Sequence, residues 1–177
     1  MTIHADFRPA VDGTVVRRLR EAGTVLLGKL AMTEGAFSDH HPDYAVPVNP
    51  WSAGFWSGVS SSGAGVGTAA SLCFASLGSD TGGSIRHPAA MCGVTGIKPT
   101  AGRVSFAGVF PLSHTLDCVG PLAQTARDCA RLLTHISSPN AADPWCTPRA
   151  NEDYEATLDG NIKGLRIGVP QSYYREN

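Results

Sequence analysis

The order of apolar and polar positions near the start of the chain predicts a helix followed by a buried strand. The stretch GTVVRRLREAG follows a candidate N-cap at Asp12, repeats apolar residues at helical spacing and reaches a natural stop at Gly23. The apolar face consists of Val15, Val16, Leu19 and Ala22. The next run, TVLLG at 24–28, is short and apolar, which is typical of a strand buried on both faces of a sheet. A helix beside such a strand indicates an α/β protein.

Four later stretches complete the predicted elements. Residues 37–56 carry three prolines with little periodicity, so we expect a long ordered loop. The segment at 57–73 consists almost wholly of small residues, and each glycine would cost an exposed helix about 1 kcal/mol, so we expect it to be packed and buried. TARDCARLLTHI opens with a Thr125/Asp128 capping pair and predicts a helix. GLRIGVP at 164–170 predicts a strand.

Composition narrows the class of protein. A chain of 177 residues has the length of one domain or of one piece of a larger domain. The formal net charge of -1, with no long basic run, gives no support for direct nucleic-acid binding. Five cysteines without a CxxC pair indicate neither a disulfide framework nor a zinc site. With no signal-peptide pattern and no apolar run of about 18 residues, the sequence predicts a cytoplasmic protein without a membrane partner.

Two short motifs suggest chemistry that their details contradict. GTVLLGKL at 23–30 follows the phosphate-binding pattern GxxxxGK[ST] for seven positions, but it ends in Leu30, which lacks the hydroxyl for magnesium. DHHPD at 39–43 crowds two imidazoles and two carboxylates together. Adjacent histidines on an extended loop point apart, and nothing else supplies a clear ligand set, so we expect a solvated loop rather than a metal site.

The loop GSDTGGSIRHP at 78–88 combines several features of a nucleophile-bearing turn. Consecutive glycines let the backbone amides of residues 81–84 converge, which can build an oxyanion hole from main chain alone, with Ser84 at its rim. A structural turn held by an Asp80/Arg86 ion pair explains the same residues. The loop has no GxSxG pattern, and the nearness of His87 in sequence does not establish a Ser-His-Asp triad.

Two serine-rich segments together resemble the amidase signature family. These segments are GVSSSGAGVG at 58–67 and LGSDTGGSIRHPAAMCGVTGIKPTAGRVS at 77–105. AGTVLLGKLAMTE and NPW upstream, and LDCVGPLAQTARD downstream, extend the likeness over most of the chain. The resemblance implies an α/β fold in which helices cover both faces of a mixed β-sheet, a Ser-cis-Ser-Lys triad and no cofactor.

The resemblance also implies a role for each residue of the loop. Ser84 corresponds to the nucleophile and Ser60 to the bridging serine whose peptide bond is cis. Ser61, Asp80 and Arg86 correspond to supporting residues. The amides of the oxyanion hole would belong to Thr81, Gly82, Gly83 and Ser84.

The chain departs from the family pattern in two ways. The first serine segment commonly reads GGSSGGS, whereas this sequence has Val59, Ser62 and Ala64 in place of glycine, glycine and serine. The catalytic lysine of the family lies in a KD segment upstream of the AGTVLLGK motif, and none of the lysines here matches it; these are Lys29, Lys98 and Lys163. Residues 1–177 are therefore interpreted as a partial amidase domain, a catalytic-core segment incomplete at both ends.

Three functions remain open. The first is an amidase that hydrolyses a small non-peptide carboxamide to a carboxylate and ammonia or an amine through a serine acyl-enzyme, with this 177-residue chain inactive by itself. The second is the glutaminase subunit of a tRNA-dependent amidotransferase. The third is a noncatalytic fragment or interaction protein. The expected partner is a small amide substrate, and a homo-oligomer stays open.

Overall fold

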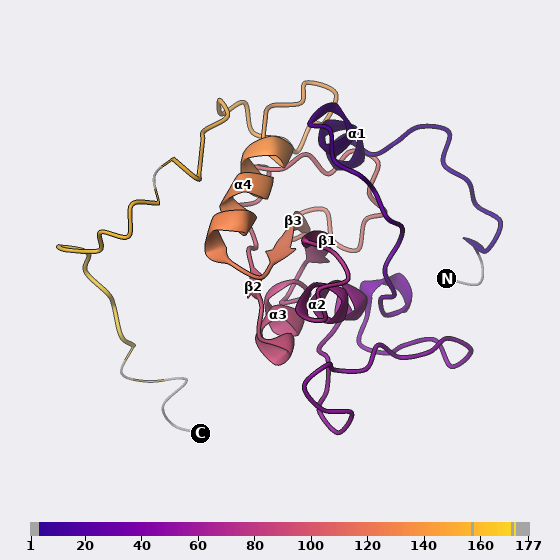
Figure 1. Ribbon diagram of the computed structural model, residues 1–177. Coiled ribbons are helices and arrows are strands. Elements are labelled where there is room, and N and C mark those ends of the chain that lie inside the picture. Colours follow the sequence, from indigo (N-terminus) through magenta and orange to yellow (C-terminus); the bar gives the residue numbers. More distant parts are fainter. Residues whose placement is uncertain (1–3, 157, 171, 173–177) are drawn as a thin grey trace.

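A three-stranded antiparallel sheet lies between two groups of helices in the computed structural model, which describes residues 4–156, 158–170 and 172 (Figure 1). The strands are β1 (Ala75–Asp80), β2 (Thr95–Gly96) and β3 (Cys118–Ala123), in the order β1-β3-β2. The helices are α1 (Thr14–Glu21), the 3-10 helix η2 (Glu34–Ala36), α2 (Ser62–Ala69), α3 (Arg86–Cys92) and α4 (Ala126–Ile136). In Figure 1, α1 and α4 lie on one side of the strands, and α2 and α3 lie on the other.

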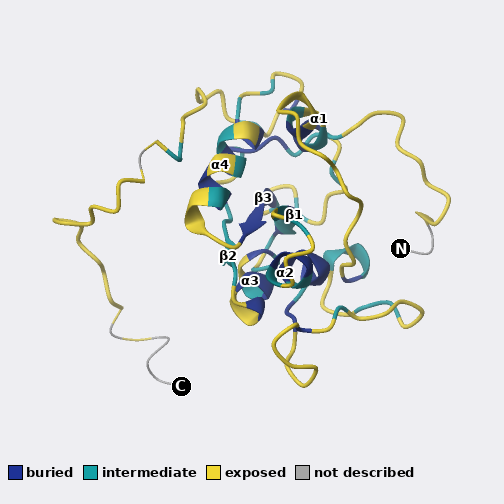
Figure 2. Ribbon diagram, in the orientation of Figure 1, coloured by how far each residue is buried: buried dark blue, intermediate teal, exposed yellow. Residues whose placement is uncertain are grey.

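Successive side chains along a strand point to opposite faces of the sheet, so the core consists of two clusters, one on each face. Leu122 on β3 faces the α2–α3 side, where it packs in one buried cluster with Ile85 and Ala89. Val119, an odd number of positions away, belongs to the opposite face and packs with buried residues of α1 and α4. Figure 2 shows this arrangement as buried positions along the strands and on the helix faces that meet them. Helices on both faces of the sheet confirm the α/β prediction.

Helix α2 is built from small residues because two backbones approach it closely. A Cβ on Gly63 would lie 2.5 Å from the Ala31 carbonyl oxygen, and a Cβ on Gly65 would lie 2.9 Å from the Pro88 carbonyl oxygen on α3. The prediction of a packed, buried segment at 57–73 is therefore confirmed as far as Ala69, whereas residues 70–72 are exposed. Helix α2 therefore packs directly on the backbone at Ala31 and on α3. This packing fixes the position of Ser60 and Ser61, which come just before α2.

The two predicted helices are confirmed, with one difference at a cap. In α4, Thr125 Oγ1 accepts a hydrogen bond of 3.1 Å from the Asp128 amide, as the capping pair predicts. In α1, the N-cap is Gly13 without a side-chain cap. Asp12 instead accepts a hydrogen bond of 2.7 Å from Arg20, which removes its carboxylate from the predicted capping role.

The buried strand predicted at 24–28 and the strand predicted at 164–170 are both wrong for the part of the chain that the structure describes. Each segment runs without strand pairing and lies exposed, with Val25 at 82% and Ile167 at 83% of full exposure. An apolar run indicates that its side chains prefer burial. A strand forms, however, only where a neighbouring strand pairs with its backbone N–H and C=O groups. Among the described residues, none pairs with either segment.

Two further expectations concern loops and membranes. Residues 37–56 form turns and irregular structure after η2, which confirms the predicted long loop. Among the residues that the structure describes, no helix has the length and apolar character needed to cross a membrane.

Gly120→Ala is expected to destabilise the fold by about 2–3 kcal/mol because overpacking a tight core costs energy of this order. A Cβ at this position would overlap the Ile97 carbonyl oxygen and lie 2.9 Å from Pro99 Cδ. Urea unfolding should show a lower midpoint with an unchanged slope. Gly168→Ala is the matched control, since its Cβ would have no neighbour within 4 Å. Equal midpoints for the two variants would contradict the packing argument.

Candidate active site

The glycine-rich loop between β1 and α3 places Ser84 at the edge of a small cavity. Ser84 is half-buried, and Gly83 has a φ of 147°, a conformation that favours glycine. The cavity measures about 250 Å³. Its lining consists of Ala36, Phe37, Ser38, Val59, Gly82, Gly83, Ser84 and His87. Three of the four residues predicted to supply oxyanion amides therefore line one cavity, and Thr81 does not.

The structure brings the two predicted catalytic serines onto adjacent segments. The Ser61 amide donates a hydrogen bond of 3.2 Å to the Ser84 carbonyl oxygen. The peptide bond between Val59 and Ser60 is cis, the geometry that the resemblance implies at this serine. Ser60 is only 1% exposed, and its Oγ has no hydrogen-bond partner among the described residues. The segments therefore meet through the backbone, while the two hydroxyls are not joined to each other.

Ser61 and Thr33 hold the segment around Ser60 in place. Ser61 Oγ donates a hydrogen bond of 3.3 Å to the Ser79 carbonyl oxygen on β1. A Cβ on Gly78 would lie 2.7 Å from this hydroxyl, so the strand needs glycine at that position. The buried Thr33 donates its amide to the Ser60 carbonyl oxygen at 3.1 Å. Ser60 is thus held by contacts on both sides of it in the chain.

Asp80 is a fully buried carboxylate that ties the two ends of the loop together. Arg86 donates to it from Nε at 3.0 Å and from Nη2 at 3.1 Å. The amides of Ile85 and Arg86 donate to the same carboxylate at 3.1 and 3.2 Å. Burial raises the pKa of Asp80, but the Arg86 side chain and the two backbone donors outweigh it and lower the pKa to about 2. Asp80 also raises the pKa of Arg86, chiefly through their hydrogen bonds.

Sequence reasoning missed the position of Lys98, which it considered only as a base. Lys98 Nζ donates to the Thr81 carbonyl oxygen at 2.6 Å and to the Leu116 carbonyl oxygen at 3.0 Å, and it lies 3.3 Å from Asp80 Oδ1. Thr81 Oγ1 in turn donates to Asp117. The sequence holds no local signal for these contacts, because Thr81 and Leu116 lie 17 and 18 positions from Lys98.

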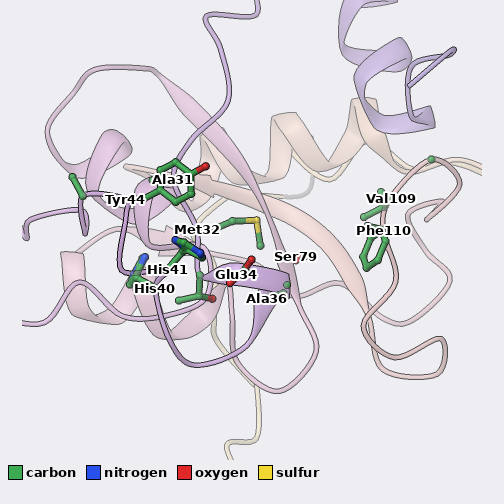
Figure 3. Close-up of a pocket in the computed structure, with 14 residues that line it drawn as sticks. Ala31, Met32, Glu34, Ala36, His40, His41, Tyr44, Ser79, Val109 and Phe110 are labelled. Carbon is green, nitrogen blue, oxygen red and sulfur yellow. The ribbon is translucent and has the colours of Figure 1, made fainter. Parts of the chain in front are cut away.

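The DHHPD motif is less solvated than expected. His40 is half-buried, and its Nε2 lies 3.1 Å from Oγ of the buried Ser62. It also lines a second cavity of about 680 Å³, in which Figure 3 shows Tyr44, His40 and His41 on one wall and Phe110 on another. Among the described residues, no group of three or more His, Cys, Asp or Glu side chains could hold a metal ion.

His87 shares the small cavity with Ser84, but its ring has a structural neighbour. It packs edge-on against Trp56 with ring centroids 4.6 Å apart. This contact joins Trp56 to a residue that lines the cavity.

Asp80→Asn should lower the free energy of unfolding by about 2 kcal/mol at pH 7, because it removes the buried charge that accepts hydrogen bonds from Arg86 and from two backbone amides. The folded-state pKa of about 2 lies below the ordinary aspartate value of about 3.9. The charge therefore stabilises the fold above about pH 4, and this contribution is lost as the pH falls toward 2.

Denaturant titrations at pH 7, 4 and 2 measure this difference. Asp39→Asn, in an exposed loop, is the control and should stay within about 0.5 kcal/mol of the unmodified chain. A deficit for Asp80→Asn that is equally large at pH 2 would contradict the role of the charge.

Comparisons with known proteins identify the family of this chain. The Amidase family model matches residues 1–177. The putative amidase AmiD of Mycobacterium tuberculosis (strain ATCC 25618 / H37Rv) is 59% identical over 171 residues, covering 97% of this chain and 36% of that relative. A glutamyl-tRNA(Gln) amidotransferase subunit of Roseiflexus sp. (strain RS-1) is 47% identical over 171 residues, covering 96% of this chain and 35% of that relative.

A solved structure extends the likeness to the fold. The native peptide amidase from Stenotrophomonas maltophilia superposes with a TM-score of 0.78 at 41% identity, covering 85% of this chain and 33% of that one. The predicted resemblance and fold class are therefore confirmed. The chain spans about a third of the length of the curated relatives it matches. Because the Amidase family model matches all 177 residues, the chain belongs to the amidase family.

Proposed function

We propose that this chain carries the nucleophile and the relay serine of a serine amidohydrolase. In this proposal the whole protein hydrolyses a small carboxamide in the cytoplasm to a carboxylate and ammonia or an amine. Ser84 is the nucleophile, Ser60 the proton relay, and the base is a lysine that lies outside the 177 residues. The 177-residue chain by itself is then inactive.

The observation that carries this proposal is the hydroxyl of Ser60. It is buried behind the Ser84 loop and has no hydrogen-bond partner among the described residues. A buried hydroxyl without a hydrogen-bond partner destabilises a fold by about 1–3 kcal/mol. A buried serine of this kind is therefore expected where a further group binds its hydroxyl. A lysine amine within reach of this oxygen would satisfy it and would supply the base of the relay.

The arrangement supports a complete acyl-transfer cycle. A neutral lysine amine takes the Ser60 proton while Ser60 Oγ takes the Ser84 proton, and Ser84 Oγ bonds to the amide carbon. The amides of Gly82, Gly83 and Ser84 donate hydrogen bonds to the resulting oxyanion. The C–N bond then breaks as the relay returns a proton to the leaving nitrogen, and water hydrolyses the acyl-serine ester.

The lining of the Ser84 cavity supports an uncharged group beside the reacting carbon. Phe37, Val59 and Ala36 supply apolar surface, and His87, which packs against Trp56, supplies an aromatic ring. These residues favour a neutral carboxamide at this point of the site.

A second candidate function is the glutaminase subunit of a tRNA-dependent amidotransferase. The 47% identity to an amidotransferase subunit supports it. Glutamine hydrolysis measured with and without amidotransferase partner subunits separates the two. Hydrolysis that requires the partners would favour the amidotransferase, whereas hydrolysis of simple carboxamides alone would favour the stand-alone amidase.

Ser84→Ala should abolish covalent labelling by a fluorophosphonate probe, read as a mass increase of the intact protein. The test uses a version extended upstream through the lysine that the resemblance implies. Ser60→Ala should slow labelling by about 100-fold or more, because the relay then lacks its proton acceptor. Ser52→Ala, in an exposed loop, should label at the unmodified rate.

Two outcomes would overturn the assignment. Continued labelling of Ser84→Ala would place the nucleophile elsewhere. A folded, extended protein that never labels would favour the noncatalytic alternative.

A further inference from the structure

We infer that Lys98 is a positioning residue that strengthens the oxyanion hole from behind, through the Thr81–Gly82 peptide group. This inference rests on the proposed function, because it assigns a role within the same site. It concerns a lysine that is neither the base of the relay nor part of the cavity lining.

The contacts of Lys98 converge on the back of the catalytic loop. Its Nζ donates a hydrogen bond of 2.6 Å to the Thr81 carbonyl oxygen, and a second of 3.0 Å to the Leu116 carbonyl oxygen. The side chain is mostly shielded from solvent, at 21% exposure. The same ammonium lies 3.3 Å from Asp80 Oδ1, at the end of β1. Lys98 therefore joins the strand end, the loop and the segment before β3.

The Thr81 carbonyl and the Gly82 amide belong to one peptide group. Gly82 lies on the cavity side of this group, beside Ser84, while the ammonium lies on the carbonyl side. A cation that binds a peptide oxygen draws electron density toward that oxygen and makes the N–H of the same peptide a stronger donor. Because the amide is fixed before the reaction begins, the added strength is available when negative charge develops on the substrate.

Neutralising Asp80 does not by itself require Lys98. Arg86 already binds the carboxylate through two nitrogens, and the amides of Ile85 and Arg86 add two more donors. Thr81 is further fixed through its hydroxyl, which donates to Asp117. With the loop held by these contacts, the distinctive contribution of Lys98 is a positive charge on the Thr81 carbonyl.

Lys98→Met is therefore expected to lower kcat by roughly 10- to 100-fold, less than the loss of a whole oxyanion donor. KM should stay within about twofold, because the added hydrogen-bond strength acts on charge that develops only in the transition state. Lys98→Arg should restore most of the rate, since it keeps the cation. Lys98→Gln provides a second neutral variant if Lys98→Met does not fold, and Lys163→Met, on the exposed segment, is the control.

A second readout does not depend on activity. The amide proton resonance of Gly82, observed in full-length protein with ¹⁵N-glycine, should move upfield in the neutral variants and return in Lys98→Arg. Unchanged kcat together with an unchanged Gly82 resonance would overturn the inference. A fall in kcat that Lys98→Arg does not restore, without a shift at Gly82, would also overturn it and indicate only structural support.

The same set of proteins separates this inference from the proposed function. Hydrolysis that persists in Ser84→Ala would overturn the proposed function, while the Gly82 resonance would still decide whether Lys98 polarises the peptide. Loss of hydrolysis in Ser84→Ala, with Lys98→Met equal to the unmodified protein in both readouts, would leave the proposed function standing and refute the role of Lys98.

Discussion

The buried carboxylate of Asp80 is the constraint on which the candidate site depends. It ends β1, accepts two hydrogen bonds from Arg86 at the start of α3, and accepts two more from backbone amides at the end of the loop. A buried charge without such partners would be strongly unfavourable, so the loop is forced to bring its donors to one point. The turn that results presents Ser84, Gly82 and Gly83 to the cavity.

Close packing then fixes the second serine relative to the first. The glycines of α2 allow the backbone at Ala31 and the backbone of α3 to come into contact with α2. Gly78 on β1 leaves space for the Ser61 hydroxyl. Larger side chains at these positions would separate α2 from the sheet and move Ser60 away from the loop. The small-residue composition of 57–73 is therefore a requirement of the site geometry as well as of the core.

The sequence was informative where local rules and tertiary contacts agree. The Thr125 cap, the apolar stripe of α4 and the small residues of α2 each have a local signal that matches their packing. The strands predicted at 24–28 and 164–170 are wrong, because an apolar composition does not by itself provide a second strand to pair with. The Asp80/Arg86 pair could be predicted from its spacing. Lys98 could not, because its contacts with Thr81 and Leu116 depend on how three distant segments meet.

The three departures from the common GGSSGGS pattern make different contacts around the candidate site. Val59 lines the Ser84 cavity, and Ala64 packs against the α3 side of the core. Ser62 contacts His40 of the DHHPD motif and donates weakly, at 3.4 Å, to the Ser60 carbonyl oxygen. If Ser62 donates to that carbonyl, then its oxygen accepts a hydrogen bond from a protonated Nε2 of His40. A serine in place of glycine thus links loop 37–56, which also supplies Phe37 to the cavity, to the backbone of Ser60. Of these changes, Val59 alters the wall beside Ser84, while Ser62 and Ala64 alter the contacts around it, and Ser60 and Ser84 keep their positions in the motif.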